Sequence, residues 1–283
     1  MSYGVNIYLR VFIKPDCYWR AKEKEMKKRV RREVAELFEK EKEAYIPRKI
    51  TEEDLAGLPE PVQRYLRYTQ IIGKGKVRTA RLKQKGYFRT KESQKWMPFK
   101  AEEYFTVNPP AFLWYGRIRL FPLVSFDAID KFYRNEGSLV VKLSSLIKVA
   151  DAKGEECNQA ELVRFLNEII WFPTAFLSDY IHWEPINSDS ARATISVAGL
   201  TASADLYFNQ QGKMTNFVAE RYMDVNGGSI LKKWFTPIKK YAEINGIMVP
   251  VKGEGVWKLS FGDFPYIRIT EISDIEYNNP NVF

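Results

Sequence analysis

Few residues of this 283-residue chain have the types and spacing that catalysis requires. The one histidine is His182, and Glu184 could orient it as a base only if the chain turns there, since residues i and i+2 share one face of a strand. Among the carboxylates, Glu168 is the best catalytic candidate, because its helical segment is expected to be buried on one side and lies close to Trp171. A hydrolase-like enzyme that uses Glu168 or His182 is therefore one hypothesis for function.

Each of these candidates also has a structural interpretation, which we favour. Arg164 stands four residues before Glu168, the spacing of a structural ion pair along a helix. His182 is expected to be a partly buried structural histidine. Asp127 and Asp130 would point to opposite faces of a strand, which makes them a poor acid–base pair, and Asp130 is expected to be solvated. We therefore predict no catalytic residue, and we favour a protein that is not an enzyme.

The sequence indicates neither a metal nor a cofactor. Cys17 and Cys157 stand 140 positions apart, so clustered Cys and His ligands for zinc are absent, and a secreted disulfide framework is disfavoured. The string Gly73–Lys76 looks like a phosphate-binding fragment, but it lacks the spacing of a P-loop and precedes a strand rather than a helix. We predict no metal and no cofactor.

Aromatic side chains give a larger signal than polar ones, because they make up 14% of the chain. Trp and Tyr often line apolar pockets, so a curved sheet that carried them on its concave face could hold a lipid or another hydrophobic small molecule. A well-filled core is the alternative. The predicted ligand-binding residues are Phe112, Trp114, Phe126, Trp171, Phe176, Trp183, Trp234 and Trp257.

The net charge of +9 is unevenly distributed, since residues 1–100 carry +13 and residues 101–283 carry −4. The segment Lys74–Lys100 alone holds ten basic residues and one acidic residue. An anionic membrane surface is one partner that this pattern suggests, and a solvated face that keeps the protein soluble is the alternative. Nucleic acid is disfavoured, because the aromatic signature of RNA-binding sheets is missing. The predicted anionic-surface residues are Arg81, Lys83, Lys85 and Arg89.

Three zones of secondary structure would position these residues. The zone Asp16–Tyr45 is a charged helix with one narrow apolar stripe, which can dock on the rest of the chain or pair with a second helix in an oligomer. Helical segments follow in Thr51–Gln70. The zone Lys76–Tyr277 is typical of about ten antiparallel strands, interrupted by an amphipathic helix at Asn158–Phe172.

We predict an α+β protein with a large curved antiparallel sheet, or half-barrel, packed on helices, and with an N-terminal charged helix. Residues 1–50 would form a charged helical arm, and residues 51–283 a single β-rich domain that contains helix 158–172. The apolar stretch Gly4–Ile13 is too short to span a bilayer and lacks the flanks of a signal peptide. A cytoplasmic location is therefore expected, with the first turns available for peripheral attachment to a membrane.

Several strings resemble an uncharacterised prokaryotic family of proteins of unknown function. The resemblance covers roughly Leu55–Tyr277, and its most specific part is the helix that runs into Trp171-Phe172-Pro173. It implies a fold similar to that of the LolA and LolB lipoprotein carriers of the bacterial envelope. Relatives often carry N-terminal membrane spans, where this sequence has a charged helix. The strings that carry the resemblance are Leu58–Leu66, Gly86–Arg89, Pro110–Trp114 and Glu161–Ala175.

Three hypotheses for function follow from these patterns. The first is a non-enzymatic module that binds a hydrophobic or amphipathic ligand, such as a lipid, in the concave face of the sheet. The second is the hydrolase-like enzyme that uses Glu168 or His182. The third is a scaffold that docks on a membrane surface or another protein through the basic N-terminal helix.

Overall fold

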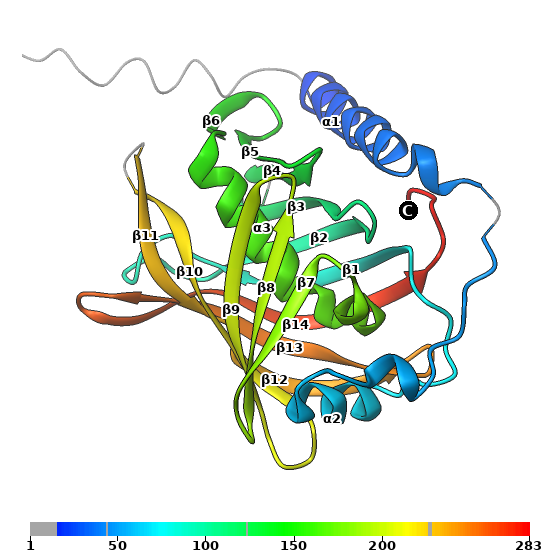
Figure 1. Cartoon of the computed structure of the whole chain (residues 1–283). Helices are drawn as coiled ribbons and strands as arrows, with labels where there is room; N and C mark the ends of the chain where they lie inside the picture. Colours follow the sequence, from blue (N-terminus) through cyan, green and yellow to red (C-terminus); the bar gives the residue numbers. More distant parts are fainter. Residues whose placement is uncertain (1–15, 44, 123, 226–227) are drawn as a thin grey trace, which may run out of the picture.

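A computed structural model describes residues 16–43, 45–122, 124–225 and 228–283 of the chain (Figure 1). Within these residues, fourteen strands form one sheet in the order β6-β5-β4-β3-β2-β1-β14-β13-β11-β10-β9-β8-β7, with β12 paired to β13. The predicted α+β class and curved antiparallel sheet are confirmed, but the estimate of about ten strands is too low. Strands such as β6 and β11 are exposed along most of their length, so the alternation that marks a strand in the sequence is weak there.

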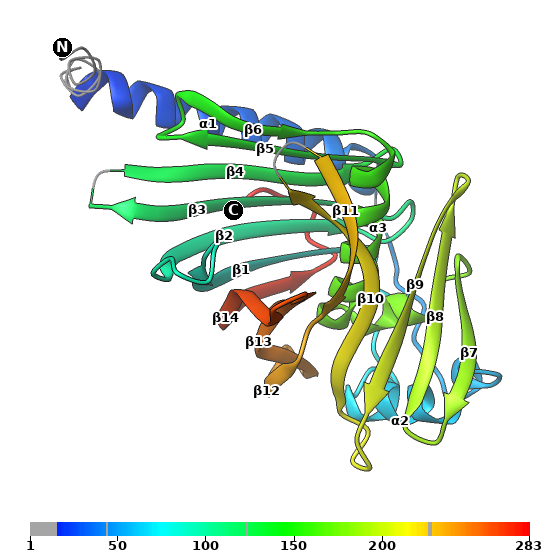
Figure 2. The ribbon, with the colours of Figure 1, turned by 90° about the vertical axis from the view of Figure 1, so that its left-hand side faces the viewer.

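The sheet curls into two walls that face each other (Figure 2). The first wall holds the N-terminal strands together with the last three strands of the chain. Because β14 pairs with both β1 and β13, it lies inside this wall rather than at its edge. Its strands are β1 Thr79–Phe88, β2 Met97–Thr106, β3 Ala111–Phe121, β4 Val124–Tyr133, β5 Glu136–Leu143, β6 Ile147–Ala152, β12 Ile238–Ile244, β13 Ile247–Leu259 and β14 Gly262–Tyr277.

The second wall is a five-stranded meander that joins the first wall at a narrow seam. There β11 pairs with β13 through Trp234↔Trp257 and Phe235↔Val256. Strands β6 and β7 form the two ends of the path, so the sheet is an open half-barrel. The strands of the second wall are β7 Ile181–Asn187, β8 Ser190–Val197, β9 Leu200–Phe208, β10 Met214–Val225 and β11 Gly228–Phe235.

Helix α3, Glu155–Glu168, lies on the concave side and packs on β4 and β5 of the first wall and on β9 and β10 of the second (Figure 1). Two 3-10 turns continue it, Ile169–Trp171 and Pro173–Leu177. The helix predicted at Asn158–Phe172 is therefore present but begins earlier, after Gly154. Asn158 does not cap it, because its side-chain oxygen accepts a hydrogen bond from the Gly137 N–H of β5 at 2.7 Å.

Helix α2, Glu60–Tyr68, covers the lower end of the half-barrel in Figure 1, with a short 3-10 turn, Glu53–Leu55, before it. Its Tyr65 is fully buried against the rings of Phe176 and Phe208, at centroid distances of 5.2 and 5.6 Å. The core between α2, α3 and the sheet thus fills one end of the half-barrel with packed side chains.

Helix α1, Asp16–Leu37, lies on the convex side of the first wall, opposite α3 (Figures 1 and 2). Its apolar stripe is buried against β2, β3 and β4, and Glu23 and Glu33 form ion pairs with Arg117 and Lys131 at 2.7 and 2.9 Å. The charged helix predicted from the sequence therefore docks on its own sheet. The stretch Gly4–Ile13 lies outside the described residues. The stripe consists of Met26, Val30, Val34, Leu37 and Phe38.

Candidate functional site

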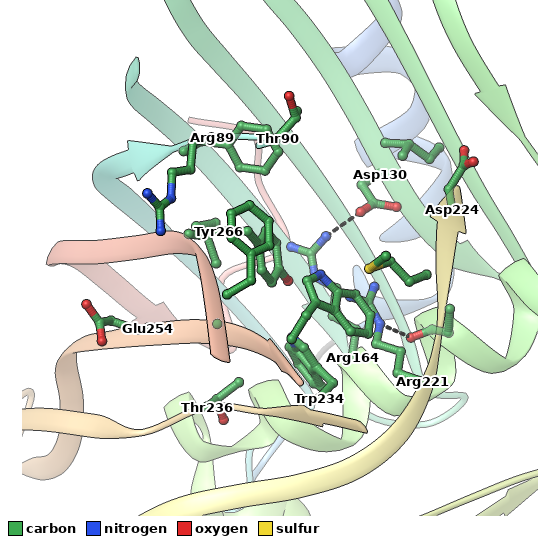
Figure 3. Close-up of a pocket in the computed structure, with 18 of the residues that line it drawn as sticks. Arg89, Thr90, Asp130, Arg164, Arg221, Asp224, Trp234, Thr236, Glu254 and Tyr266 are labelled. Carbon is green, nitrogen blue, oxygen red and sulfur yellow. Dashed lines mark hydrogen bonds and ion pairs between the residues drawn. The ribbon is translucent and has the colours of Figure 1, made fainter. Parts of the chain in front are cut away.

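A cavity of about 1210 Å³ lies between the two walls, in the part of the half-barrel that α3 leaves unfilled (Figure 3). Apolar side chains from β3, β4, β5, β13 and β14 make up much of its lining. Its rim includes the β1–β2 turn and residues at the tips of the β10–β11 and β13–β14 hairpins, among them Asp224 and Phe261. The cavity is therefore a deep apolar space that opens at one end of the sheet.

Five of the eight aromatic residues predicted to bind a ligand line this cavity: Trp114, Phe126, Trp171, Trp234 and Trp257. The structure places the other three in the packed core, outside the lining. Phe112 is fully buried, and Phe176 stacks on Trp183 with ring centroids 5.3 Å apart. The abundance of aromatic residues in the strands and the helix suggested an apolar pocket, but it could not show where along each element the packed core ends and the cavity begins.

Trp114 shows how the sequence shapes the lining. Its indole N–H donates to the side-chain oxygen of Gln84 at 3.0 Å, which fixes the ring across the floor of the cavity. The ring lies over Gly116, where a Cβ atom would come within 1.9 Å of it. Gly116 therefore leaves the space that this ring occupies. Sequence analysis named Trp114 but missed both supporting residues.

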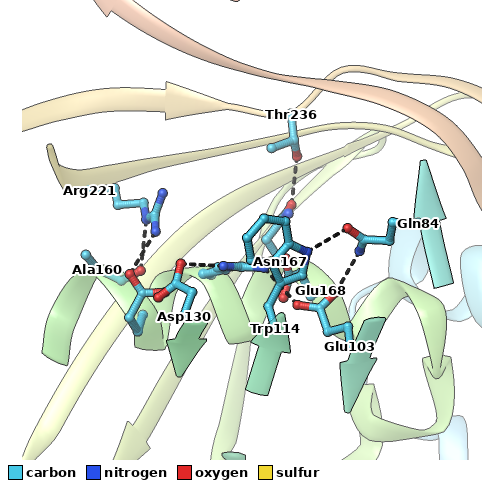
Figure 4. A network of polar contacts seen from close by, with 11 residues as sticks. Gln84, Glu103, Trp114, Asp130, Ala160, Asn167, Glu168, Arg221 and Thr236 are labelled. Carbon is cyan, nitrogen blue, oxygen red and sulfur yellow. Dashed lines mark hydrogen bonds and ion pairs between the residues drawn. The ribbon is translucent and has the colours of Figure 1, made fainter. Parts of the chain in front are cut away.

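A network of buried charges forms the floor of the cavity (Figure 4). Arg164 of α3 is its centre, because its guanidinium donates to Glu103 of β2 at 2.8 Å, to Asp130 of β4 at 2.6 Å and to Glu168 of α3 at 2.8 Å. Gln84 then donates to the second oxygen of Glu103 at 2.6 Å. The ion pair predicted between Arg164 and Glu168 is present, yet both side chains are buried in the cavity floor rather than set on a solvated face.

A second arginine ties the opposite wall to α3. Arg221 of β10 donates to the Ala160 carbonyl at 2.9 Å and to Glu161 at 3.1 Å. Its guanidinium also lies over the rings of Trp234 and Trp257, at 4.9 and 5.8 Å from their centroids. The two arginines therefore hold α3 between the walls, one on each side.

Burial raises the pKa of three acids around this floor, Glu103, Glu161 and Glu168. It raises the pKa of Glu103 well above its ordinary value, and the charge of Glu168 adds to the effect. Burial also raises the pKa of Glu168, although Arg164 opposes it. The pKa of Glu161 rises to about 8, through burial first and then the neighbouring Asp130. Protons are therefore retained in this floor at neutral pH.

The polar residues singled out for chemistry are not brought together. His182 is exposed on β7, at one end of the sheet path and outside the cavity lining, so the expectation of a partly buried histidine is wrong. Glu168 lies in the cavity but is bound to Arg164. Asp130 is 8% exposed rather than solvated, because α3 supplies a partner that lies 34 residues further along the chain. Glu103, Glu161 and Arg221 were not predicted from the sequence to take part in a site.

The basic face predicted on β1 is matched by acids on β14. Arg81 pairs with Glu276 at 2.9 Å and Lys85 with Glu271 at 2.7 Å. Lys83 pairs with Asp274 at 3.4 Å. Arg89 is the exception, because it turns into the rim of the cavity and donates to the Pro265 carbonyl at 2.8 Å. The strand therefore offers less free positive charge than its sequence suggests.

Cys157 lines the cavity, and burial raises the pKa of its thiol to about 12, which keeps it protonated at neutral pH. Within the described ranges, no three His, Cys, Asp or Glu side chains are grouped so that they could hold a metal ion. None of the helices described here is both long and apolar enough to cross a bilayer.

Comparisons with known proteins give a family and a structural neighbour. The model of a family described as Family of unknown function (DUF6544) matches residues 48–269, which begin after α1. A crystal structure of a LolA superfamily protein from Nitrosomonas europaea is similar, with a TM-score of 0.43 and 9% sequence identity, over 81% of this chain and 94% of that chain. The search of curated proteins found no match.

Proposed function

We propose that this chain, which belongs to the DUF6544 family of unknown function, binds a hydrophobic or amphipathic small molecule, such as a lipid, in the cavity between its two walls. The observation that carries the proposal is the cavity of about 1210 Å³, which exceeds the roughly 300–1,000 Å³ of most small-molecule sites. Elongated apolar molecules need such a space.

The distribution of polarity supports an amphipathic occupant. Side chains such as Ile118, Phe126, Val141 and Ile269 line the walls, while the charged network is confined to the floor beside α3. A ligand with one polar end and one apolar end would match both regions. The hydrolase hypothesis gains less support, because His182 lies outside the cavity lining and Glu168 is held by Arg164.

The first test is direct. Lipid extraction and mass spectrometry of the purified protein should detect an apolar or amphipathic molecule at close to one per chain. Native protein that carries no such molecule, and that also fails to take up a fluorescent fatty-acyl probe, would contradict the proposal.

Two neighbouring valines of β5 provide a matched pair of variants. Val141 lines the cavity, whereas Val140 precedes it on the strand, points to the opposite face and is not in the lining. We expect Val141→Trp to weaken uptake of the acyl probe at least about tenfold, because the indole occupies ligand space. Val140→Trp should bind as the parent does. Equal binding by both variants would place the ligand elsewhere.

Cytoplasmic location and peripheral attachment to an anionic membrane stay predictions. Co-sedimentation of the full chain with phosphatidylserine vesicles, compared with phosphatidylcholine vesicles, tests the attachment, since binding driven by basic residues requires the anionic lipid.

A further inference from the structure

We propose that the cavity prefers amphiphiles whose polar head is a primary ammonium group, and that Asp130 and Glu161 receive this head at the floor. The inference rests on the ligand-binding function proposed above and specifies the class of ligand. Its basis is two of the three carboxyl oxygens in the cavity lining that have no hydrogen-bond partner among the described residues.

These oxygens are Oδ1 of Asp130 and Oε2 of Glu161, and neither has a hydrogen-bond partner among the described residues. The two residues are 8% and 5% exposed, and both line the cavity. Each uses its other oxygen for an arginine, Asp130 for Arg164 at 2.6 Å and Glu161 for Arg221 at 3.1 Å. Buried acceptors without a donor are costly, so a ligand that brings N–H groups would satisfy both.

The two carboxyl groups come from different elements and are close enough to interact electrostatically. Asp130 is on β4 of the first wall, and Glu161 is on α3. The charge of Asp130 contributes to the raised pKa of Glu161, second only to burial. A head group placed between them would therefore contact a wall and the helix at once. An ammonium group has three donors and suits such a site.

The number of acidic groups in the floor, compared with the number of basic groups, favours a cation over an anion as the ligand's head. Four carboxyl groups share two guanidinium groups: Glu103, Asp130 and Glu168 contact Arg164, and Glu161 contacts Arg221. An ammonium head would favour the ionised form of these carboxyl groups and pair with it, whereas the carboxylate of a fatty acid would compete with them for the two guanidinium groups. The head would enter first, and the acyl chain would then lie along the apolar walls toward the rim.

The raised pKa of Glu161, about 8, gives the proposal a signature that can be measured. At pH 7 this carboxyl group holds its proton, and an adjacent ammonium would favour the ionised form, so binding should release a proton. An alkylamine keeps its own charge there, because its pKa is near that of lysine, about 10.4. The groups that face Glu161 are Asp130 on β4, Arg221 on β10 and Tyr266 on β14, with Cys157, Arg164 and Glu168 on α3 itself.

The test compares three probes with the same chain and different heads: dodecylammonium, dodecanol and dodecanoate, titrated calorimetrically into the full protein below their micellar concentrations. We expect dodecylammonium to bind at least about tenfold more tightly than either of the others. In the double variant Asp130→Asn, Glu161→Gln, the affinity for dodecylammonium should lie within about twofold of the affinity for dodecanol. Glu155→Gln, an exposed acid of the same helix outside the cavity lining, should keep the parental preference.

Each result decides between the two proposals. If the three probes bind equally, or if dodecanoate binds best, the ammonium site is wrong and the ligand-binding function stands. If none binds to the parental protein, the ligand-binding function itself fails. If the double variant does not fold, the parental protein can still test the inference. Calorimetric titration with dodecylammonium at pH 7, in buffers of different ionisation enthalpy, should then show that binding releases a proton. No proton release, or proton uptake, would overturn the inference.

Discussion

Arg164 holds together more of the site than any other residue described here. It contacts three carboxyl groups on three elements, with 13% of its side chain exposed. Removing one partner of a buried ion pair leaves the other charge uncompensated, which costs far more than the loss of an exposed pair. The stability of the floor therefore depends on this one side chain.

We expect Arg164→Gln to lower the free energy of unfolding by about 3–5 kcal/mol near pH 8. The loss should be smaller at pH 5, because Glu103 and Glu168 already have raised pKa values and can take up protons when their partner is gone. Urea denaturation at both pH values measures it. The matched control is Arg192→Gln, which removes an exposed pair with Asp205 on the second wall and should have a much smaller effect. An equal loss of unfolding free energy in the two variants would show that burial does not increase the contribution of an ion pair to stability.

Glu161 gives the protein a pH dependence of defined sign. Its pKa is about 8 in the folded chain against an ordinary value of 4.5, so between those values the folded state binds more protons than the unfolded state. The free energy of unfolding should therefore fall as the pH rises from 5 to 8. Glu161→Gln keeps the neutral form and should flatten this slope, whereas Glu155→Gln on the same helix should not. Denaturation midpoints at pH 5, 6.5 and 8 measure the slope, and an unchanged slope in Glu161→Gln would refute the assignment.

The sequence revealed the residues that act within one element better than those that act between elements. Arg164 and Glu168 could be paired from their spacing along a helix, and Trp114 could be named as a pocket residue only because it is aromatic. Asp130 and Glu161 could not be connected to this floor, because their partners come from other strands and helices. The same limit explains Arg81 and its neighbours on β1, whose acidic partners lie on β14, about 200 residues away.

At the scale of elements, α1 and α3 use the two faces of the same wall in different ways. Helix α3 packs between both walls and bounds the cavity, while α1 covers the convex face through one apolar stripe. Asp127 anchors this outer face, because it accepts hydrogen bonds from Arg117 at 2.9 Å and from Ser145 at 2.8 Å, and Arg117 continues to Glu23 of α1. The stripe of α1 was visible in the sequence, but its docking surface was not, since Tyr104, Leu113 and Ile129 meet only in the folded sheet.

We expect Val34→Asp to detach α1, because Val34 is fully buried on the sheet and a carboxylate there would lack a partner. Ala35→Asp places the same charge on the exposed side of the helix and serves as the control. Hydrogen exchange should speed up in α1 for Val34→Asp alone, with the amides of β1 and β14 unchanged. Faster exchange throughout the sheet would instead mean that α1 stabilises the whole wall.

For the whole molecule, the geometry of the half-barrel depends on α3 as much as on strand pairing. The seam between β11 and β13 consists of Trp234↔Trp257 and Phe235↔Val256. Arg164 binds α3 to the first wall, and Arg221 binds it to the second. The distance between the walls, and with it the width of the cavity, is therefore set by the buried charges on both sides of the helix.

Arg221→Met tests this view. We expect hydrogen exchange to increase in β10 and β11, because the second wall loses its polar tie to Ala160 and Glu161, while β2, β3 and β4 keep their protection. Arg192→Met, on the same wall but exposed, should leave both regions unchanged. An equal increase in both walls would show that the sheet opens as one unit.

The position of β14 between β1 and β13 of the first wall has a consequence for the order in which the sheet can form during synthesis. A chain emerging from the ribosome delivers β1–β6 first and the meander β7–β11 next, and each of these groups pairs largely with its own neighbours in sequence. Strand β1 must wait for its second partner until β14 is translated, because Ala80 pairs with Tyr277. During that interval β1 offers an unpaired edge on which chaperones or other nascent chains can act. Strand β14, which follows all of these strands in the sequence, is thus the one that unites the halves of the sheet.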